Sequence, residues 1–294
     1  MSDPQRSPAT QAAVGRSLAG AHSLARGDAA QPLLSAREVH RVYRLPRTTL
    51  FGPRAERHAL SGVSIDVGAG DTIGIVGESG SGKSTLARIL LGLDKATSGT
   101  VTYQGRPVEP GRPSELRWFR RDVQIVFQDP LSSLDPRMHV ADIVAEPLVG
   151  LDVPGSHADR VVEVLEAVGI DPSTRDRYPH EFSGGQQQRI AIARALAPNP
   201  DVLVADEPVS ALDVSVRAQI LDLLKHLVDE FHLSLVLVSH DLGVIHSLCD
   251  RVMVLHGGRC VEEGSTVGVF ADPQDPYTRK LLAAVPRLPD VAAS

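Results

Sequence analysis

The sequence predicts an α/β fold: a mostly parallel sheet with an antiparallel β subdomain and an inserted α-helical subdomain. Residues 33–76 contain alternating and apolar runs that are typical of strands. From residue 201 onward, short apolar runs alternate with helical segments, which favours a parallel sheet. Between these regions, residues 131 to about 196 carry helix-period segments such as 158–168, whose apolar side chains fall on one face.

Individual strands are predicted from alternation or from continuous apolar character. The runs concerned are 39–43, 63–67, 73–76, 123–127, 202–205 and 233–238. Near the C-terminus, residues 252–255 and 259–262 flank Gly257-Gly258, which is the pattern of a hairpin. Cys260 is then an ordinary strand residue.

Residues 77–84 form a glycine-rich run that matches G-x-x-x-x-G-K-[ST] without exception. An apolar strand precedes the run, and a segment of helical character follows from Thr85. This context predicts a loop whose backbone N–H groups surround phosphate oxygens, with Lys83 reaching the β- and γ-phosphates and Ser84 ligating Mg²⁺. The alternative is a Gly/Ser-rich turn that matches by chance. The predicted nucleotide contacts are Gly77, Glu78, Ser79, Gly80, Ser81, Gly82, Lys83, Ser84 and Thr85.

An acidic pair follows the apolar run at 202–205. A central parallel strand there would deliver Asp206 and Glu207 to its carboxyl end, where doubly wound sheets bind ligands. Asp206 suits an outer-shell contact to Mg²⁺, and Glu207 suits a general base that polarises the attacking water. A surface Asp-Glu pair that merely closes a strand is the plainer alternative.

The run Phe182-Ser183-Gly184-Gly185-Gln186, taken with the phosphate loop and the acidic pair, resembles the ATP-binding subunit of an ABC transporter. The resemblance covers roughly residues 33–288 and implies a P-loop NTPase core of the RecA-like kind that uses ATP and Mg²⁺. It implies that Gln128 touches Mg²⁺ or its water and couples to a membrane subunit. It also implies that Ser183, Gly184, Gly185 and Gln186 contact the γ-phosphate of ATP held by an opposite subunit.

The same resemblance assigns three further residues. It places Asp213 near the seam of a dimer. It implies that His240, which follows the strand at 233–238, contacts the γ-phosphate. It also implies that Tyr43 is the aromatic residue that stacks on adenine. Three of the residues that the resemblance assigns have plainer readings. Gln128 alone is an ordinary polar loop residue, His240 a strand-end histidine without a role, and Tyr43 a packed strand tyrosine. For the Ser-Gly-Gly-Gln run, the plainer alternative is an ordinary turn before a helix that begins near Gln187.

Four segments narrow the resemblance to the oligopeptide/dipeptide importer ATPases: 126–137, 178–182, 206–215 and 275–282. The stretch from Tyr43 to Leu60 is more similar to the second of the two ATPase subunits that such importers commonly use. The resemblance implies two transmembrane permease subunits, a second ABC ATPase subunit in a homo- or heterodimer, and an indirect extracytoplasmic solute-binding protein. It implies a location at the cytoplasmic face of the inner cell membrane. Open alternatives are import of nickel or another small solute, and a soluble ABC ATPase that acts on nucleic acid or ribosomes.

Composition sets the remaining limits. The 294 residues divide into a tail at 1–32, an ATPase domain at 33–264 and an extension at 265–294. The tail is either disordered or a transit peptide, and we favour disorder. A net charge of −6 without a dense Lys/Arg run argues against a nucleic-acid partner. Two cysteines suggest a reducing compartment, and no apolar stretch is long enough for a transmembrane helix.

Overall fold

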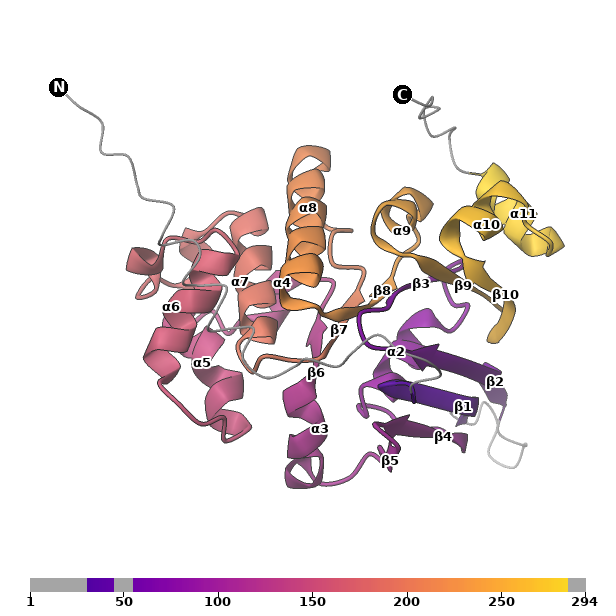
Figure 1. The fold of residues 1–294 in the computed structure, drawn as a ribbon, viewed down its shortest axis with the longest axis horizontal. Helices are drawn as coiled ribbons and strands as arrows, with labels where there is room; N and C mark the ends of the chain where they lie inside the picture. Colours follow the sequence, from indigo (N-terminus) through magenta and orange to yellow (C-terminus); the bar gives the residue numbers. More distant parts are fainter. Residues whose placement is uncertain (1–30, 45–54, 285–294) are drawn as a thin grey trace.

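The computed structural model describes residues 31–44 and 55–284 of the chain, and these contain two sheets with helices around them (Figure 1). The tail predicted at 1–32 therefore lies outside the described residues except for its last two. Most of the stretch between Tyr43 and Leu60 that favours the second ATPase subunit lies outside them as well.

The smaller sheet is antiparallel and has the order β2-β1-β4-β5. Its strands are β1 (Leu34–Arg44), β2 (Glu56–Val67), β4 (Ser98–Tyr103) and β5 (Arg106–Pro107). This sheet is the antiparallel subdomain that the sequence predicts. It brings Tyr43 of β1 opposite Arg57 of β2, since the two residues are partners in the strand register.

The larger sheet has six strands in the order β10-β9-β3-β8-β7-β6. All neighbours are parallel except β9 and β10, which form the predicted hairpin around Gly257-Gly258. Its strands are β3 (Thr72–Val76), β6 (Val123–Val126), β7 (Val202–Asp206), β8 (Ser234–Val238), β9 (Arg251–His256) and β10 (Arg259–Ser265). The predicted α/β fold with a mostly parallel sheet is therefore confirmed.

Helices cover the larger sheet and extend beyond its β6 edge (Figure 1). Helices α5, α6 and α7 pack against one another, and their middle member α6 matches the helix predicted at 158–168 within a residue at each end. The α-helices are α2 (Lys83–Leu90), α3 (Arg117–Asp122), α4 (Pro130–Ser133), α5 (Val140–Gly150), α6 (His157–Ala167), α7 (Gly184–Leu196), α8 (Val214–Phe231), α9 (Leu242–Leu248), α10 (Thr266–Ala271) and α11 (Pro276–Ala283). Short 3₁₀ turns lie at Pro113–Leu116, Pro172–Thr174 and Pro179–Glu181.

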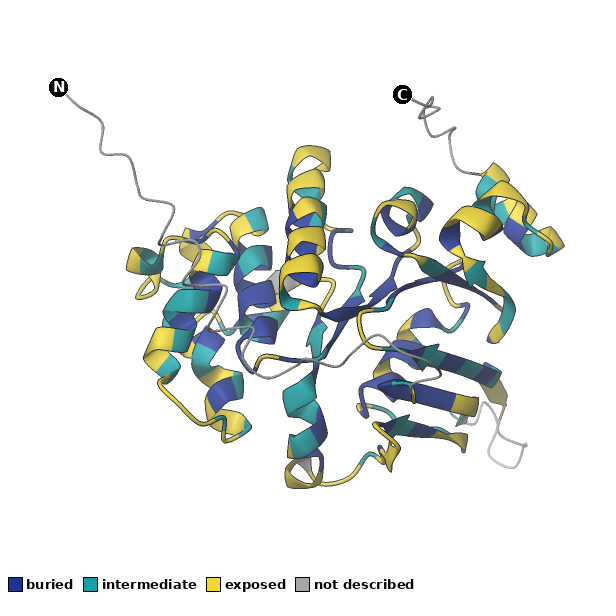
Figure 2. Ribbon diagram, viewed as in Figure 1, coloured by how far each residue is buried: buried dark blue, intermediate teal, exposed yellow. Residues whose placement is uncertain are grey.

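The core lies in two parts, one on each face of the larger sheet. The strands of that sheet are the buried ones in the middle of Figure 2. Successive strand side chains point to opposite faces, so alternate residues join different parts. In β7, Val202 and Val204 pack with α2 and the smaller sheet, whereas Leu203 and Ala205 pack toward α7 and α8. Burial on both faces explains why the parallel strands are continuously apolar. It also fixes the carboxyl ends of β3, β7 and β8, on which the site depends.

One further property of the described residues concerns membranes. Within 31–44 and 55–284, no helix combines the length and the apolar character that crossing a bilayer requires.

Candidate functional site

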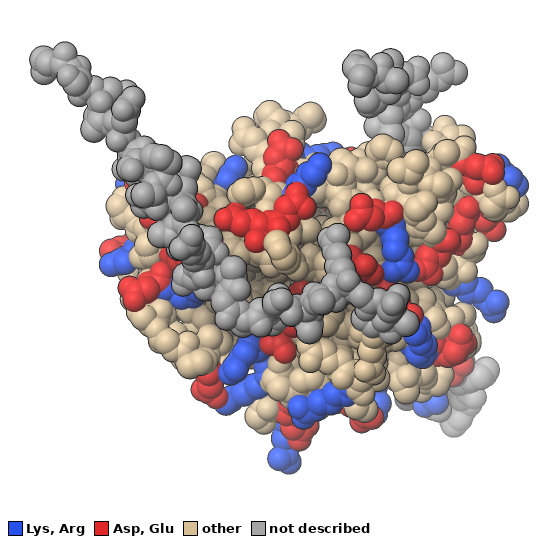
Figure 3. Space-filling model, viewed as in Figure 1, with Lys and Arg blue, Asp and Glu red and all other residues tan. Residues whose placement is uncertain are grey.

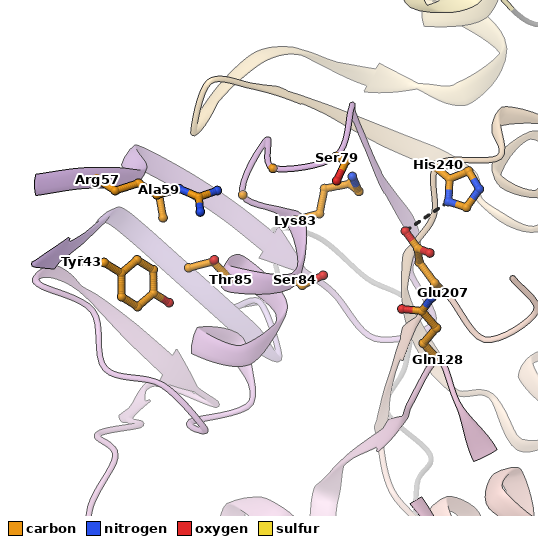
Figure 4. A pocket seen from close by; sticks show the side chains of 12 residues that line it. Tyr43, Arg57, Ala59, Ser79, Lys83, Ser84, Thr85, Gln128, Glu207 and His240 are labelled. Atoms are coloured by element: carbon orange, nitrogen blue, oxygen red, sulfur yellow. Dashed lines mark ion pairs between the residues drawn. The ribbon is translucent and has the colours of Figure 1, made fainter. Parts of the chain in front are cut away.

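A cavity of about 500 Å³ lies between the smaller sheet and the carboxyl ends of β3, β7 and β8. Figure 4 shows residues of β1 and β2 on one side, the glycine-rich loop in the middle, and Gln128, Glu207 and His240 on the other. The lining residues are Tyr43, Arg57, Ala59, Ser79, Gly80, Gly82, Lys83, Ser84, Thr85, Gln128, Glu207 and His240. Most of the residues that the sequence singles out are thus brought to one place.

The loop between β3 and α2 has a shape that only glycine permits at two of its positions. Gly77 has a φ of 149°, and a Cβ on it would lie 2.1 Å from the carbonyl oxygen of Leu255. Gly82 has a φ of 109°, and a Cβ there would lie 2.6 Å from the carbonyl oxygen of Ala59. The loop is therefore packed against the β9–β10 hairpin on one side and β2 on the other. Helix α2 begins directly after Gly82, so its positive end points at the loop.

Lys83 is the buried cation of the loop. Its Nζ donates to the carbonyl oxygens of Gly77 at 2.7 Å and Glu78 at 3.0 Å, while its side chain also lines the cavity. Burial lowers the pKa of Lys83, and the nearby carboxylates of Glu207 and Asp206 oppose that shift. The ammonium group thus ties together two carbonyl groups of the loop, and it lies near the carboxylates of Asp206 and Glu207.

Asp206 and Ser84 form the part of the site that fits a metal ion. The Ser84 hydroxyl donates to Asp206 Oδ1 at 3.3 Å. Burial raises the pKa of Asp206, the hydrogen bond from Ser84 opposes that shift, and the neighbouring Glu207 carboxylate adds to it. A hydroxyl, a carboxylate and the Gln128 amide at the cavity are oxygen donors of the kind Mg²⁺ takes. A bound cation would also offset the cost of keeping Asp206 ionised, so these residues fit Mg²⁺.

Glu207 follows β7 in an unusual backbone conformation. Its φ is 49°, a region that residues with a Cβ seldom adopt, and such strain is often found at functional sites. The position is held because its N–H donates to the carbonyl oxygen of Val238 at 2.9 Å, and its carbonyl oxygen accepts from Ser210. This backbone turns the Glu207 carboxylate toward the cavity, where its Oε1 lies 3.2 Å from Nδ1 of His240 (Figure 4).

Tyr43 lies at the far end of the cavity from Glu207 (Figure 4). Its hydroxyl donates to Asp94 Oδ2 at 2.7 Å, and the guanidinium of Arg41 lies 4.3 Å from its ring centroid. Arg41 also pairs with Asp94 at 2.8 Å. These contacts fix the ring in place at the cavity wall, which is the position that stacking on a flat base requires. Its stacking role stays a prediction.

Sequence reasoning missed Arg57 and Ala59, which line the same cavity from β2. The signal that was available is strand pairing, because Arg57 stands opposite Tyr43 in the β1–β2 register. Among the described residues, the exposed Arg57 side chain makes no hydrogen bond or ion pair, and one of its terminal nitrogens lies 3.5 Å from where a Cβ on Gly80 would be. Its guanidinium therefore lies at the rim of the phosphate loop.

Other predicted residues lie outside the cavity. Gly77, Glu78 and Ser81 belong to the loop without lining the cavity, and Asp206 stands behind Ser84. Asp213 is exposed at the position that precedes α8.

The Ser-Gly-Gly-Gln run also stands apart from the cavity, and its local structure differs from the expectation. We expected the helix to begin near Gln187, but α7 begins at Gly184, so the run is not the ordinary turn of the alternative reading. Ser183 caps the helix: its hydroxyl accepts from the Gln186 N–H at 3.3 Å, and the Gln186 amide oxygen accepts from the Ser183 N–H at 2.9 Å. This reciprocal capping box draws the two glycines into the first helical turn. Ser183, Gly184 and Gln186 are exposed.

The side chain of Gln187 binds the backbone of the residues that precede α7. Its side chain is buried at the start of α7. Its amide nitrogen donates to the carbonyl oxygens of Pro179 at 2.9 Å and Phe182 at 3.0 Å. A neutral donor satisfies both carbonyls without burying a charge.

A phosphate loop between a strand and a helix, with an acidic pair at a neighbouring strand end, defines the P-loop NTPase class. A family model described as "ABC transporter" matches residues 60–210 of this chain. A dipeptide transport ATP-binding protein of Haemophilus influenzae is 47% identical over 259 residues, which cover 87% of this chain and 79% of that protein. The chain therefore belongs to the ABC transporter family.

Other relatives agree. A glutathione import ATP-binding protein of Escherichia coli is 48% identical over 259 residues, and the match spans 87% of this chain but only 41% of that protein. A dimeric ATP-binding cassette solved with ADP and phosphate is similar with a TM-score of 0.68 and 32% identity, covering 79% of this chain and 98% of that one. A subunit of a Clostridium perfringens ABC transporter complex has a TM-score of 0.69 and 29% identity, covering 87% and 96%.

Proposed function

We propose that the chain is an ATPase subunit that powers import of peptides across a membrane. The observation that carries the proposal is the arrangement of Glu207 beside His240 in the same cavity as Lys83 and the phosphate loop. This arrangement suits attack by water on a terminal phosphate, because the Glu207 carboxylate can act as the base while Lys83 and His240 stabilise negative charge in the same cavity.

The residues divide the work of hydrolysis. The phosphate loop and Lys83 hold the triphosphate. Tyr43 contacts the adenine ring of the nucleotide, and Arg57 adds a positive charge near the loop. Glu207 accepts a proton from the attacking water, and His240 contacts the γ-phosphate and orients the Glu207 carboxylate. Ser84, Asp206 and Gln128 would hold Mg²⁺, which neutralises charge on the β- and γ-phosphates when bound.

A second ATPase subunit completes each site in this proposal. Ser183 to Gln186 lie on an exposed helix start outside the cavity, so they are free to meet ATP bound by an opposite subunit. Asp213 is exposed where the resemblance puts the dimer seam. Closure on ATP and opening after hydrolysis would turn the chemistry into motion. The homo- or heterodimeric composition stays open.

The surface also offers a place for the membrane subunits. A groove of about 540 Å³ contains the exposed apolar side chains of Leu93 (45% exposed) and Phe127 (41% exposed), and Phe127 directly precedes Gln128. We assign this groove to a helix of a permease subunit, because an apolar helix face would cover these side chains. A contact with Phe127 would therefore act on Gln128, the next residue in the chain.

The relatives, rather than the site, support peptide cargo and a place at the membrane. One relative is a dipeptide transport protein and another a glutathione import protein, and both cargoes are peptides. We accordingly place the chain at the cytoplasmic face of the membrane, held by two permease subunits and served by a solute-binding protein. The segment from 33 to 264 is the ATPase domain in this proposal, with 265–294 as an extension. Among the described residues visible in Figure 3, basic and acidic side chains are interspersed, which does not favour a nucleic-acid partner.

One experiment tests the proposal as a whole. A tagged Glu207→Gln variant is purified from native membranes with ATP and Mg²⁺, and the associated proteins are identified. We expect two permease subunits, a second ATPase and a peptide-binding protein. Recovery with ribosomes or DNA, and without membrane proteins, would reject transport. Recovery with a nickel- or other solute-binding protein would correct the cargo.

A further inference from the structure

The C-terminal helix α11 contacts the phosphate loop, although it lies outside the cavity. The Glu78 N–H donates to the hydroxyl of Tyr277 at 2.9 Å. On the other side of the same residue, the Glu78 carbonyl oxygen accepts from Lys83 Nζ at 3.0 Å. Glu78 is therefore held through its N–H by α11 and through its carbonyl by the lysine that faces the cavity.

The β9–β10 hairpin supports the loop beside this contact. The Gly258 N–H donates to the carbonyl oxygen of Ser81 at 3.0 Å. The ring of His256, at the end of β9, stacks on the ring of Tyr277 with centroids 3.9 Å apart and an interplanar angle of 28°. The hairpin thus touches both the loop and the tyrosine that binds the loop.

Helix α11 is itself fixed to β10. The Glu262 carboxylate accepts from the N–H groups of Gln274 at 2.8 Å and Asp275 at 3.1 Å. Asp275 in turn caps α11 by accepting from the Tyr277 N–H at 2.7 Å. Figure 1 shows α10 and α11 lying together next to β9 and β10. A continuous set of contacts therefore leads from the larger sheet to the Tyr277 hydroxyl.

We propose that Tyr277 is a positioning residue for nucleotide binding, and that α11 is a brace that keeps the phosphate loop in its nucleotide-accepting shape. Tyr277 does not line the cavity, so it acts through Glu78 and Lys83. A glycine-rich loop has many alternative conformations, and ordering it on binding costs free energy. A brace present before binding lowers that cost. The proposal rests on the proposed function, because it takes the loop to bind phosphates.

The test is the Tyr277→Phe variant, which keeps the ring stacked on His256 and removes only the hydroxyl. Affinity for ADP and for ATP is measured by titration of a fluorescent nucleotide analogue. Loss of one neutral hydrogen bond is expected to weaken both affinities about three- to tenfold. Hydrogen exchange of the Glu78 amide is expected to accelerate in the nucleotide-free protein, a change that a general loss of stability would spread over many amides.

Two controls separate the alternatives. Tyr103→Phe removes a buried hydroxyl that donates to Asp201 at 2.6 Å, away from the loop, and should lower the melting temperature without changing nucleotide affinity. Lys83→Ala tests the phosphate loop itself and should abolish binding. Wild-type affinity and wild-type Glu78 exchange in Tyr277→Phe, with binding lost in Lys83→Ala, would overturn the brace alone. Unchanged binding in Lys83→Ala would instead reject the proposed function of the loop.

Discussion

Glu207 and His240 meet across two neighbouring parallel strands, with 3.2 Å between Oε1 of the first and Nδ1 of the second. The pairing of Asp206 in β7 with Val238 in β8 sets this distance, since each residue follows its strand at the same edge. Glu207 is only 20% exposed, whereas His240 is 62% exposed. The base is thus sheltered, and the histidine remains accessible to a ligand.

The first prediction concerns the base. Glu207→Gln preserves the shape of the side chain and removes its ability to accept a proton. We expect ATP binding to persist and the steady-state rate of phosphate release to fall by about 10²- to 10⁴-fold. Size-exclusion chromatography with ATP should show a stable dimer. A variant that still turns over at the wild-type rate would remove Glu207 from this role.

The second prediction concerns Arg57, which lines the cavity opposite Tyr43. Arg57→Ala removes a cation from the rim of the phosphate loop. Because the side chain is exposed, we expect affinity for ATP to weaken modestly, by roughly three- to tenfold, with a smaller effect in high salt. The control is Arg37→Ala, which breaks an exposed pair with Asp66 in the same sheet. Equal affinities in the two variants would show that Arg57 does not contact nucleotide.

The third prediction concerns the pH dependence caused by Asp206. Burial raises the pKa of Asp206 above its value in the unfolded chain. Its contribution to stability is then full below the unfolded pKa and is lost as pH rises through the folded pKa. At neutral pH and without Mg²⁺, the ionised carboxylate therefore costs stability. We expect Asp206→Asn to melt at a higher temperature than wild type near pH 7.5, with the difference shrinking toward pH 4.

The same variant should lose its response to metal. Without the carboxylate, we expect the Mg²⁺ concentration that gives half-maximal ATP hydrolysis to rise by about 10- to 100-fold. Asp222→Asn, on an exposed position of α8, serves as the matched control. A lower melting temperature for Asp206→Asn at neutral pH would contradict the sign of the pKa shift.

The fourth prediction concerns the apolar groove assigned to a permease helix. Leu93→Asp places a charge on this surface, so we expect membrane subunits to be lost from purified complexes while nucleotide affinity is kept. Val267→Asp is the matched control, because Val267 is a more exposed apolar side chain (71%) on α10, outside the groove. If both variants keep their membrane subunits, the groove does not hold them.

The sequence predicts those parts of the fold and the site that depend on neighbouring residues. The shape of the phosphate loop can be predicted from its own residues, because the motif places glycine at positions 77 and 82, where the backbone angles require it. Strands β3, β7 and β8 are predicted because burial on both faces makes them continuously apolar. Arg57 was missed because its place depends on how β1 pairs with β2, where the register shifts between Arg41 and Val42. Tyr277 was missed as a contact of Glu78 because nothing local links residues so distant in the chain.

The last prediction concerns the thiols. Burial and the nearby Glu263 raise the pKa of Cys260 to about 11, and burial also raises the pKa of Cys249. The thiolate is the reactive form, so alkylation at pH 8 should be roughly two orders of magnitude slower for Cys260 than for an ordinary cysteine. Iodoacetamide labelling followed by peptide mass analysis measures this rate, and the urea-unfolded chain supplies the reference. The rate should climb as pH rises toward 11, because the fraction of Cys260 present as thiolate increases over that range. Rapid labelling of the native protein at pH 8 would mean that the strand around Cys260 opens far more often than its packing indicates.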